Sequence, residues 1–169
     1  MHAKPTRREF LWQSAVATGG LLLPAQLSWA APSETKMAIT KWAGPAPQSP
    51  TEFANIATQL TEQAVAALGG MSRFVKRGDV VWIKPNIGWD RTPELAANTN
   101  PDVVATLVRL CLDAGAKVVK VGDNPCDLPQ KAYASSGIAE AARKAGAQVI
   151  FLDRDRFREM DIKGERVRT

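Results

Sequence analysis

Histidine is nearly absent from this sequence of 169 residues, and its single example is His2 at the N-terminus. A mature form that loses the N-terminus has none, which excludes a Ser-His-Asp triad, a histidine general base and histidine-bound zinc. The two cysteines are too few for a four-thiolate metal or iron–sulfur centre within one chain. A Walker loop and a Gly-x-Gly-x-x-Gly motif are also missing, so a common nucleotide site is unsupported.

Long apolar runs are missing too, and the N-terminus has the layout of an export signal. A basic region is followed by residues 10–33, which carry no charge. The motif around Arg7 and Arg8, with Phe10 and Leu11 after them, resembles the twin-arginine export motif. The uncharged stretch is broken by glycine and proline and falls short of the roughly 20 strongly apolar residues of a spanning helix. The sequence therefore predicts the twin-arginine export machinery as a partner.

Small residues follow this stretch and predict where the signal is cleaved. Ser28 and Ala30 fit a cleavage between Ala30 and Ala31. We therefore expect residues 1–30 to be a twin-arginine signal peptide. The product is then periplasmic or otherwise exported, and a membrane-anchored form is the less favoured alternative.

Removal of the signal changes the charge of the protein. The signal holds three basic residues and one acidic residue, so cleavage lowers the net charge from +5 to +3. A charge this small, on an exported protein, argues against nucleic acid as a partner. Residues 31–48 are rich in proline and predict a connector, in which Met37-Ala38-Ile39 is a short strand candidate.

The rest, residues 49–169, alternates helical and strand patterns. Helices are predicted at 50–68, from Pro101 to Gly115, at 129–135 and at 138–145, and apolar strands at 80–84, 118–122 and 149–152. The Ala-Gly-Ala units at 114–116 and 145–147 each precede a strand that ends in Asp, which suggests a repeated unit. The order predicts a three-layer α/β fold with a mainly parallel sheet and helices on both faces, so that Trp82 is expected in the core. Three strands make a thin sheet, and we expect it to be incomplete at the C-terminus.

Ligands of open parallel sheets bind beyond the C-terminal ends of the strands. The residues predicted there form two candidate sets. A ligand-binding set comprises Lys84, Asn86, Asp123, Asn124 and Cys126, and a set for a divalent metal comprises Asp123, Asp127 and Asp153. The competing interpretation is that each strand-end Asp caps the helix or turn after it and that Lys84 serves an ion pair.

The two cysteines lie at opposite ends of the predicted sheet. Cys111 falls on an apolar helical face and is expected in the core, whereas Cys126 falls in a strand-end loop. A five-residue strand spans about 16 Å, and bridged Cα atoms lie within about 7 Å, so an internal disulfide is not expected. Cys126 is therefore a candidate ligand, a reactive thiol or half of an intermolecular bridge, or has no role.

Several motifs together resemble the exported, twin-arginine branch of the family named domain of unknown function 362. They are Val81-Trp82-Ile83-Lys84-Pro85-Asn86, Asn100-Pro101, Asp113-Ala114-Gly115-Ala116-Lys117 and Val121-Gly122-Asp123. The loop Asp123-Asn124-Pro125-Cys126-Asp127, with Tyr133-Ala134-Ser135-Ser136-Gly137-Ile138, is similar to that branch too. The resemblance covers about residues 37–169. It implies an uncharacterised α/β domain, and since family members are usually longer, it implies that this chain is an N-terminal portion. Some relatives carry iron–sulfur segments rich in Cys-x-x-Cys, which this chain lacks.

Three functions follow as hypotheses. The first is an exported domain that binds a metal, a cofactor or a small anionic ligand at its strand ends. The second is a non-catalytic periplasmic binding or assembly module. The third is an iron–sulfur-associated redox protein, which would require a missing C-terminal part. The apolar run 149–152 also predicts self-association through an exposed sheet edge.

Overall fold

The structure is a computed structural model that describes residues 37–161. The chain divides into two units, Met1–Ala31 and Pro32–Thr169, and the described residues all belong to the second. The predicted export motif and cleavage site therefore lie outside the described residues, as does most of the C-terminal tail. No helix of the described part is both long and apolar enough to cross a membrane.

The first helix, α2 (Pro50–Ala67), begins where the sequence predicts. The hydroxyl of Ser49 accepts a hydrogen bond from the Glu52 N–H at 3.2 Å, and the Glu52 carboxylate accepts one from the Gln48 N–H. The first bond satisfies an N–H group that a helix start leaves free, the second fastens the residue before the N-cap, and Pro50 has no N–H to satisfy. The expected strand at Met37–Ile39 does not form, and these residues have no regular secondary structure.

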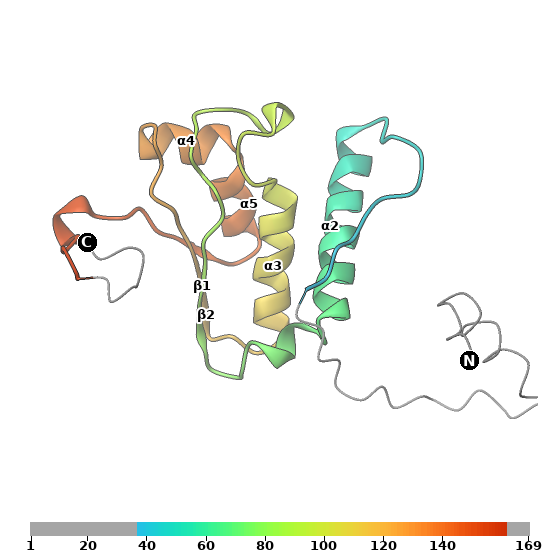
Figure 1. The fold of residues 1–169 in the computed structure, drawn as a ribbon, viewed down its shortest axis with the longest axis horizontal. Helices are drawn as coiled ribbons and strands as arrows, with labels where there is room; N and C mark the ends of the chain where they lie inside the picture. Colours follow the sequence, from blue (N-terminus) through green and yellow to red (C-terminus); the bar gives the residue numbers. More distant parts are fainter. Residues whose placement is uncertain (1–36, 162–169) are drawn as a thin grey trace, which may run out of the picture. The chain divides into compact units, whose positions relative to one another are not determined.

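Within residues 37–161, the sheet has three parallel strands in the order β1-β2-β3. Figure 1 labels the first two of them. The three strands are β1 (Val80–Ile83), β2 (Val118–Val121) and β3 (Gln148–Val149), connected by α3 (Pro101–Asp113), α4 (Pro129–Ser135) and α5 (Ile138–Lys144). Short 3-10 helices occur at Met71–Arg73, Pro93–Leu95 and Arg154–Arg156. The predicted α/β class and parallel sheet are confirmed, and each expected helix is found. The last strand is shorter than the apolar run 149–152 suggested.

The Ala-Gly-Ala units that precede β2 and β3 have the same conformation. Gly115 and Gly146 both have φ of 100°, a left-handed value that favours glycine. In each unit the following N–H reaches back across the helix end: that of Ala116 donates to the Cys111 carbonyl and that of Ala147 to the Ala142 carbonyl. The sequence repeat is therefore a repeated helix stop that directs the chain into the next strand.

One face of the sheet carries the helices. Helix α3 contacts β1 and β2, α5 contacts β3, and the two helices contact each other. Between them and the strands lies the core, which includes Val104, Val108, Cys111, Val119, Val121 and Ile138. The strands are neighbours in chain order, and both crossovers between them have the same hand. Helices α3 and α5 therefore lie on the same face of the sheet.

The opposite face departs from the sequence-based expectation. Val80 is 61% exposed and Trp82 is 46% exposed, so β1 is covered on one face where two were expected, and Trp82 does not belong to the core. Within the described residues, no helix other than α3 and α5 makes more than marginal contact with the strands. An apolar strand sequence alone does not reveal whether a layer is present to cover each of its faces.

Candidate functional site

The predicted ligand residues gather where β1 and β2 end. The register pairs Ile83 with Val121, so the segments after both strands leave at the same edge of the sheet. There the Lys84 ammonium lies 2.8 Å from the Asn86 side-chain oxygen and 3.3 Å from the Asp123 carboxylate. Lys84, Asn86 and Asp123 are therefore brought together, as the sequence suggested, by the parallel arrangement of the two strands.

Asp123 also fastens the loop that follows β1. Its second carboxylate oxygen accepts a hydrogen bond from the Ile87 N–H at 2.8 Å, and its side chain is only 11% exposed. Burial raises the pKa of this carboxyl, but hydrogen bonds from the Ile87 and Asn124 N–H groups, together with Lys84, outweigh burial. The net result is a pKa below the usual value, so Asp123 is ionised and holds the strand-end loop in place.

We expect Asp123→Asn to be less stable than the parent protein and less sensitive to acid. A carboxyl whose pKa is lower in the folded state adds stability above its unfolded-state pKa of about 3.9, and this stability is lost as the pH falls through the folded-state pKa. The variant should lose about 1–3 kcal/mol of unfolding free energy at pH 7. Its unfolding free energy should also change less than that of the parent protein between about pH 5 and pH 2.

Urea unfolding at a series of pH values measures both effects. Asp113→Asn, at an exposed carboxylate on the last turn of α3, is the matched control. Parallel pH profiles for Asp123→Asn and the parent protein would contradict the structural role of Asp123.

Asp127 joins the same two loops a few residues farther on. Its carboxylate accepts a hydrogen bond from the Asp90 N–H at 2.8 Å, and the N–H groups of Cys126 and Asp127 both donate to the Gly88 carbonyl. The Asp90 carboxylate in turn accepts a hydrogen bond from the Ser135 hydroxyl on α4. Asp127 thus behaves as a loop-capping residue, which is the competing interpretation offered for it from the sequence.

The loop between β1 and α3 is held closed by its own polar residues. The Asn98 side chain accepts from the Trp89 N–H and donates to the Trp89 carbonyl, and Thr99 and Asn86 exchange two hydrogen bonds. Sequence reasoning missed Asn98 and Thr99, although both stand directly before the Asn100-Pro101 helix start. A polar residue at the end of a long loop is a weak sequence signal. Its hydrogen-bond partner, earlier in the loop, can be identified only when the loop has folded.

Tyr133 lies beneath the site and was not predicted to belong to it. Its hydroxyl accepts from the Asp123 N–H at 2.7 Å and lies 2.9 and 3.0 Å from the Asp123 and Ile150 carbonyl oxygens, to which it can donate. The side chain is 1% exposed, and burial raises the pKa of its phenol, so it keeps its proton. Tyr133 therefore ties the ends of β2 and β3 together. Two signals could have drawn attention to it: it is the sole tyrosine of the sequence, and it begins a motif that resembles the family.

The remaining predicted residues do not form a metal centre. Asn124 and Cys126 are exposed, both cysteines are free, and Asp153 accepts a hydrogen bond from Asp155 within its own turn. Among residues 37–161, no three His, Cys, Asp or Glu side chains gather so that they could hold a metal ion. Asp123 and Asp127 are instead engaged by backbone N–H groups. Cys111 is buried as expected, and burial raises its pKa.

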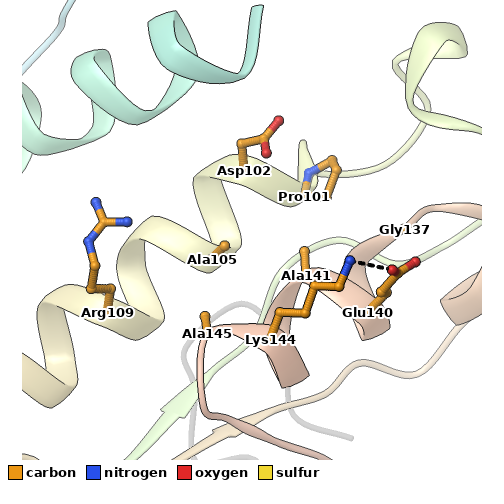
Figure 2. A pocket seen from close by; sticks show the side chains of 9 residues that line it. All are labelled: Pro101, Asp102, Ala105, Arg109, Gly137, Glu140, Ala141, Lys144 and Ala145. Carbon is orange, nitrogen blue, oxygen red and sulfur yellow. Dashed lines mark ion pairs between the residues drawn. The ribbon is translucent and has the colours of Figure 1, made fainter. Parts of the chain in front are cut away.

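A separate groove runs between α3 and α5 (Figure 2). Its volume is about 690 Å³, and small residues such as Ala105, Ala141 and Ala145 line it. At its rim, Lys144 points back to Glu140 on the same helix and forms an ion pair of 2.6 Å. Both of these side chains are more than two-thirds exposed, so the pair contributes little. None of the predicted strand-end residues lines this groove, and it is a solvated helix surface rather than part of the site.

Two comparisons with known proteins bear on the chain. The model of the family described as "Domain of unknown function (DUF362)" matches residues 81–169, more than half of the sequence. A protein of Synechocystis sp. named "Thylakoid-associated protein sll1697" is 45% identical over 58 residues. That stretch is 34% of this chain and 18% of the relative, so the chain matches about a fifth of the relative's length. No solved structure is significantly similar.

Proposed function

The chain belongs to the DUF362 family, and from this premise we propose that it is an exported α/β domain that binds a small anionic ligand at the carboxyl end of its sheet. We further propose that it belongs to the twin-arginine branch of the family and is an N-terminal portion of a periplasmic protein. The motif around Arg7 and Arg8 supports export, and the 18% coverage of the relative supports a longer whole.

The observation that carries the ligand proposal is the exposed ammonium group of Lys84. This side chain is 58% exposed, yet it is held at the sheet edge by Asn86 and Asp123. Among the described residues, the side-chain nitrogens of Asn86 and Asn124 have no hydrogen-bond acceptor. The Asn86 amide, with its free N–H donors, therefore lies beside a positive charge that is held in place, and charge-assisted hydrogen bonds to such a group suit a carboxylate or phosphate.

The same geometry favours an anion over a metal ion. The carboxylates of Asp123 and Asp127 already accept backbone hydrogen bonds, and a cation would also meet the ammonium of Lys84. The iron–sulfur alternative requires thiolates beyond the two cysteines of this sequence.

Lys84→Gln tests the proposal directly. With orthophosphate or succinate added to the full chain, we expect saturable changes in the amide resonances of Lys84 and Asn86. Binding should weaken at least about tenfold in Lys84→Gln, since loss of one charge-assisted bond corresponds to about 1.4 kcal/mol or more. Lys117→Gln makes the same change at an exposed lysine before β2, at the opposite end of the strand, and should bind as the parent protein does.

Absence of saturable binding, or equal binding by the two variants, would overturn the proposal. The second candidate, a non-catalytic assembly module, would then be favoured. It is supported by the position of β3 at one edge of the sheet within residues 37–161, and by the partial exposure of Phe151 and Leu152 after it, at 41% and 37%. This edge is where we propose that the chain self-associates.

A further inference from the structure

The face of the sheet that points away from α3 and α5 carries an aromatic ring next to the proposed anion site. Trp82 is 46% exposed on this face. Side chains alternate along a strand, and Lys84 precedes a proline, which keeps its backbone extended, so Lys84 continues the same face. The register pairs Ile83 with Val121, which sets Lys84 beside Gly122 one residue later. The indole and the ammonium group therefore lie at the same end of the same face.

Gly122 determines where the Trp82 ring lies. A Cβ atom at Gly122 would be 3.0 Å from Cζ2 of Trp82 and 2.7 Å from the Ile150 carbonyl oxygen. The indole therefore occupies the space that a side chain at position 122 would take. Gly122 is followed directly by Asp123, whose carboxylate lies 3.3 Å from the Lys84 ammonium. Two consecutive residues after β2 thus hold the ring and the cation, one by contact and the other by an ion pair.

The charge on this face has one sign. The register pairs Trp82 with Lys120, and Lys120 alternates with the buried Val119 and Val121, so it lies on the same open face as the ring. Lys120 is the sole charged residue of the described strands, and Lys84 directly follows β1. A half-exposed aromatic ring with a lysine beside it and another two residues farther on complements a ligand that is both flat and negatively charged.

We propose that the ligand of the strand-end site is a small aromatic anion. Its carboxylate or phosphate group meets the Lys84 ammonium, and its ring stacks on the exposed part of Trp82. This inference rests on the proposed anion site and adds the chemistry of the other end of the ligand. Stacking removes apolar surface of both rings from water and gains the offset contact that aromatic pairs prefer. An aliphatic anion of the same charge gains the contact with Lys84 alone.

A comparison of 2-naphthoate with acetate tests the proposal, because the two probes share a carboxylate and differ in the ring. Each is titrated into the full chain, and the amide resonances of Lys84 and Asn86 report binding. We expect 2-naphthoate to bind at least about tenfold more tightly than acetate. Lys84→Gln should weaken the binding of both probes, since both carboxylates depend on the same ammonium group.

Trp82→Thr separates the ring from the cation. It keeps a strand-forming residue in β1 but removes the indole, so the preference for 2-naphthoate should fall at least about fivefold. Acetate should bind as it does to the parent protein, which also verifies that the variant is folded. Trp42→Thr is the matched control, because Trp42 is 38% exposed and lines the apolar groove between α2 and α3 instead. This control should keep the full preference.

Equal affinities of the parent protein for the two probes would overturn the inference. So would a preference for 2-naphthoate that persists in Trp82→Thr, or one that is lost in Trp42→Thr, because the ring would then bind elsewhere. In each of these cases the anion site itself stands as long as acetate binding depends on Lys84. Failure of both probes to bind would instead overturn the proposed function, and this inference with it.

Discussion

Replacing Tyr133 by Phe is expected to lower the free energy of unfolding by about 2–4 kcal/mol, because the buried hydroxyl serves several backbone groups at once. Its removal leaves the Asp123 N–H without an acceptor and takes away the donor for the Asp123 or Ile150 carbonyl. Each buried polar group left unpaired costs about 1–3 kcal/mol. The ring itself, with its 4.6 Å centroid contact to Phe151, is retained, so the loss reports on the hydroxyl.

Urea unfolding at pH 7 measures this loss. Thr106→Val provides the control, since Thr106 is equally buried but its hydroxyl makes a single hydrogen bond of 3.3 Å to Thr58. We expect the control to lose less than about 1 kcal/mol. Similar losses in the two variants would mean that the Tyr133 hydroxyl does not hold the strand ends together.

Replacing both Arg7 and Arg8 by Lys is expected to retain the protein in the cytoplasm. The change preserves the positive charge of the N-terminus but removes the two planar guanidinium groups, whose paired donors lysine cannot reproduce. Cell fractionation, with immunodetection of the precursor and the mature form, measures the distribution. Lys4→Arg, outside the motif, should be exported as the parent protein is.

Undiminished export of the Arg7 and Arg8 double variant would indicate a general secretory route. The proposal that the chain belongs to the twin-arginine branch of the family would then lose its support. The proposal that an anion binds at Lys84 would not be affected by this result, because that proposal is tested on the purified chain.

The elements that could be predicted are those whose signals are local. Ser49 and Asn100 each accept hydrogen bonds from N–H groups of the helix that follows, and each precedes a proline at the first helical position. Gly115 and Gly146 end their helices in a left-handed conformation that other residues rarely adopt. Caps, stops and helical periodicity all act within a few residues, so one sequence contains the whole signal.

The candidate site could be predicted in part, for a topological reason. Parallel strands place their carboxyl ends together, so the meeting of Lys84, Asn86 and Asp123 follows from the strand order. The metal set of Asp123, Asp127 and Asp153 could not be judged in the same way. Whether a carboxylate is free for a ligand depends on which N–H groups reach it, and Ile87 and Asp90 do so only after the loop has folded.

The sequence by itself determined the α/β class, the order of helices and strands, the family and the edge of the sheet at which polar residues collect. Tertiary structure alone decided that Trp82 is exposed, that Tyr133 joins β2 to β3, and that Asp123 and Asp127 secure loops. The physical reason is the range of the interactions. Helix caps and strand patterns depend on neighbours along the chain, whereas burial and hydrogen-bond partnership depend on residues that lie far apart in sequence until the chain folds.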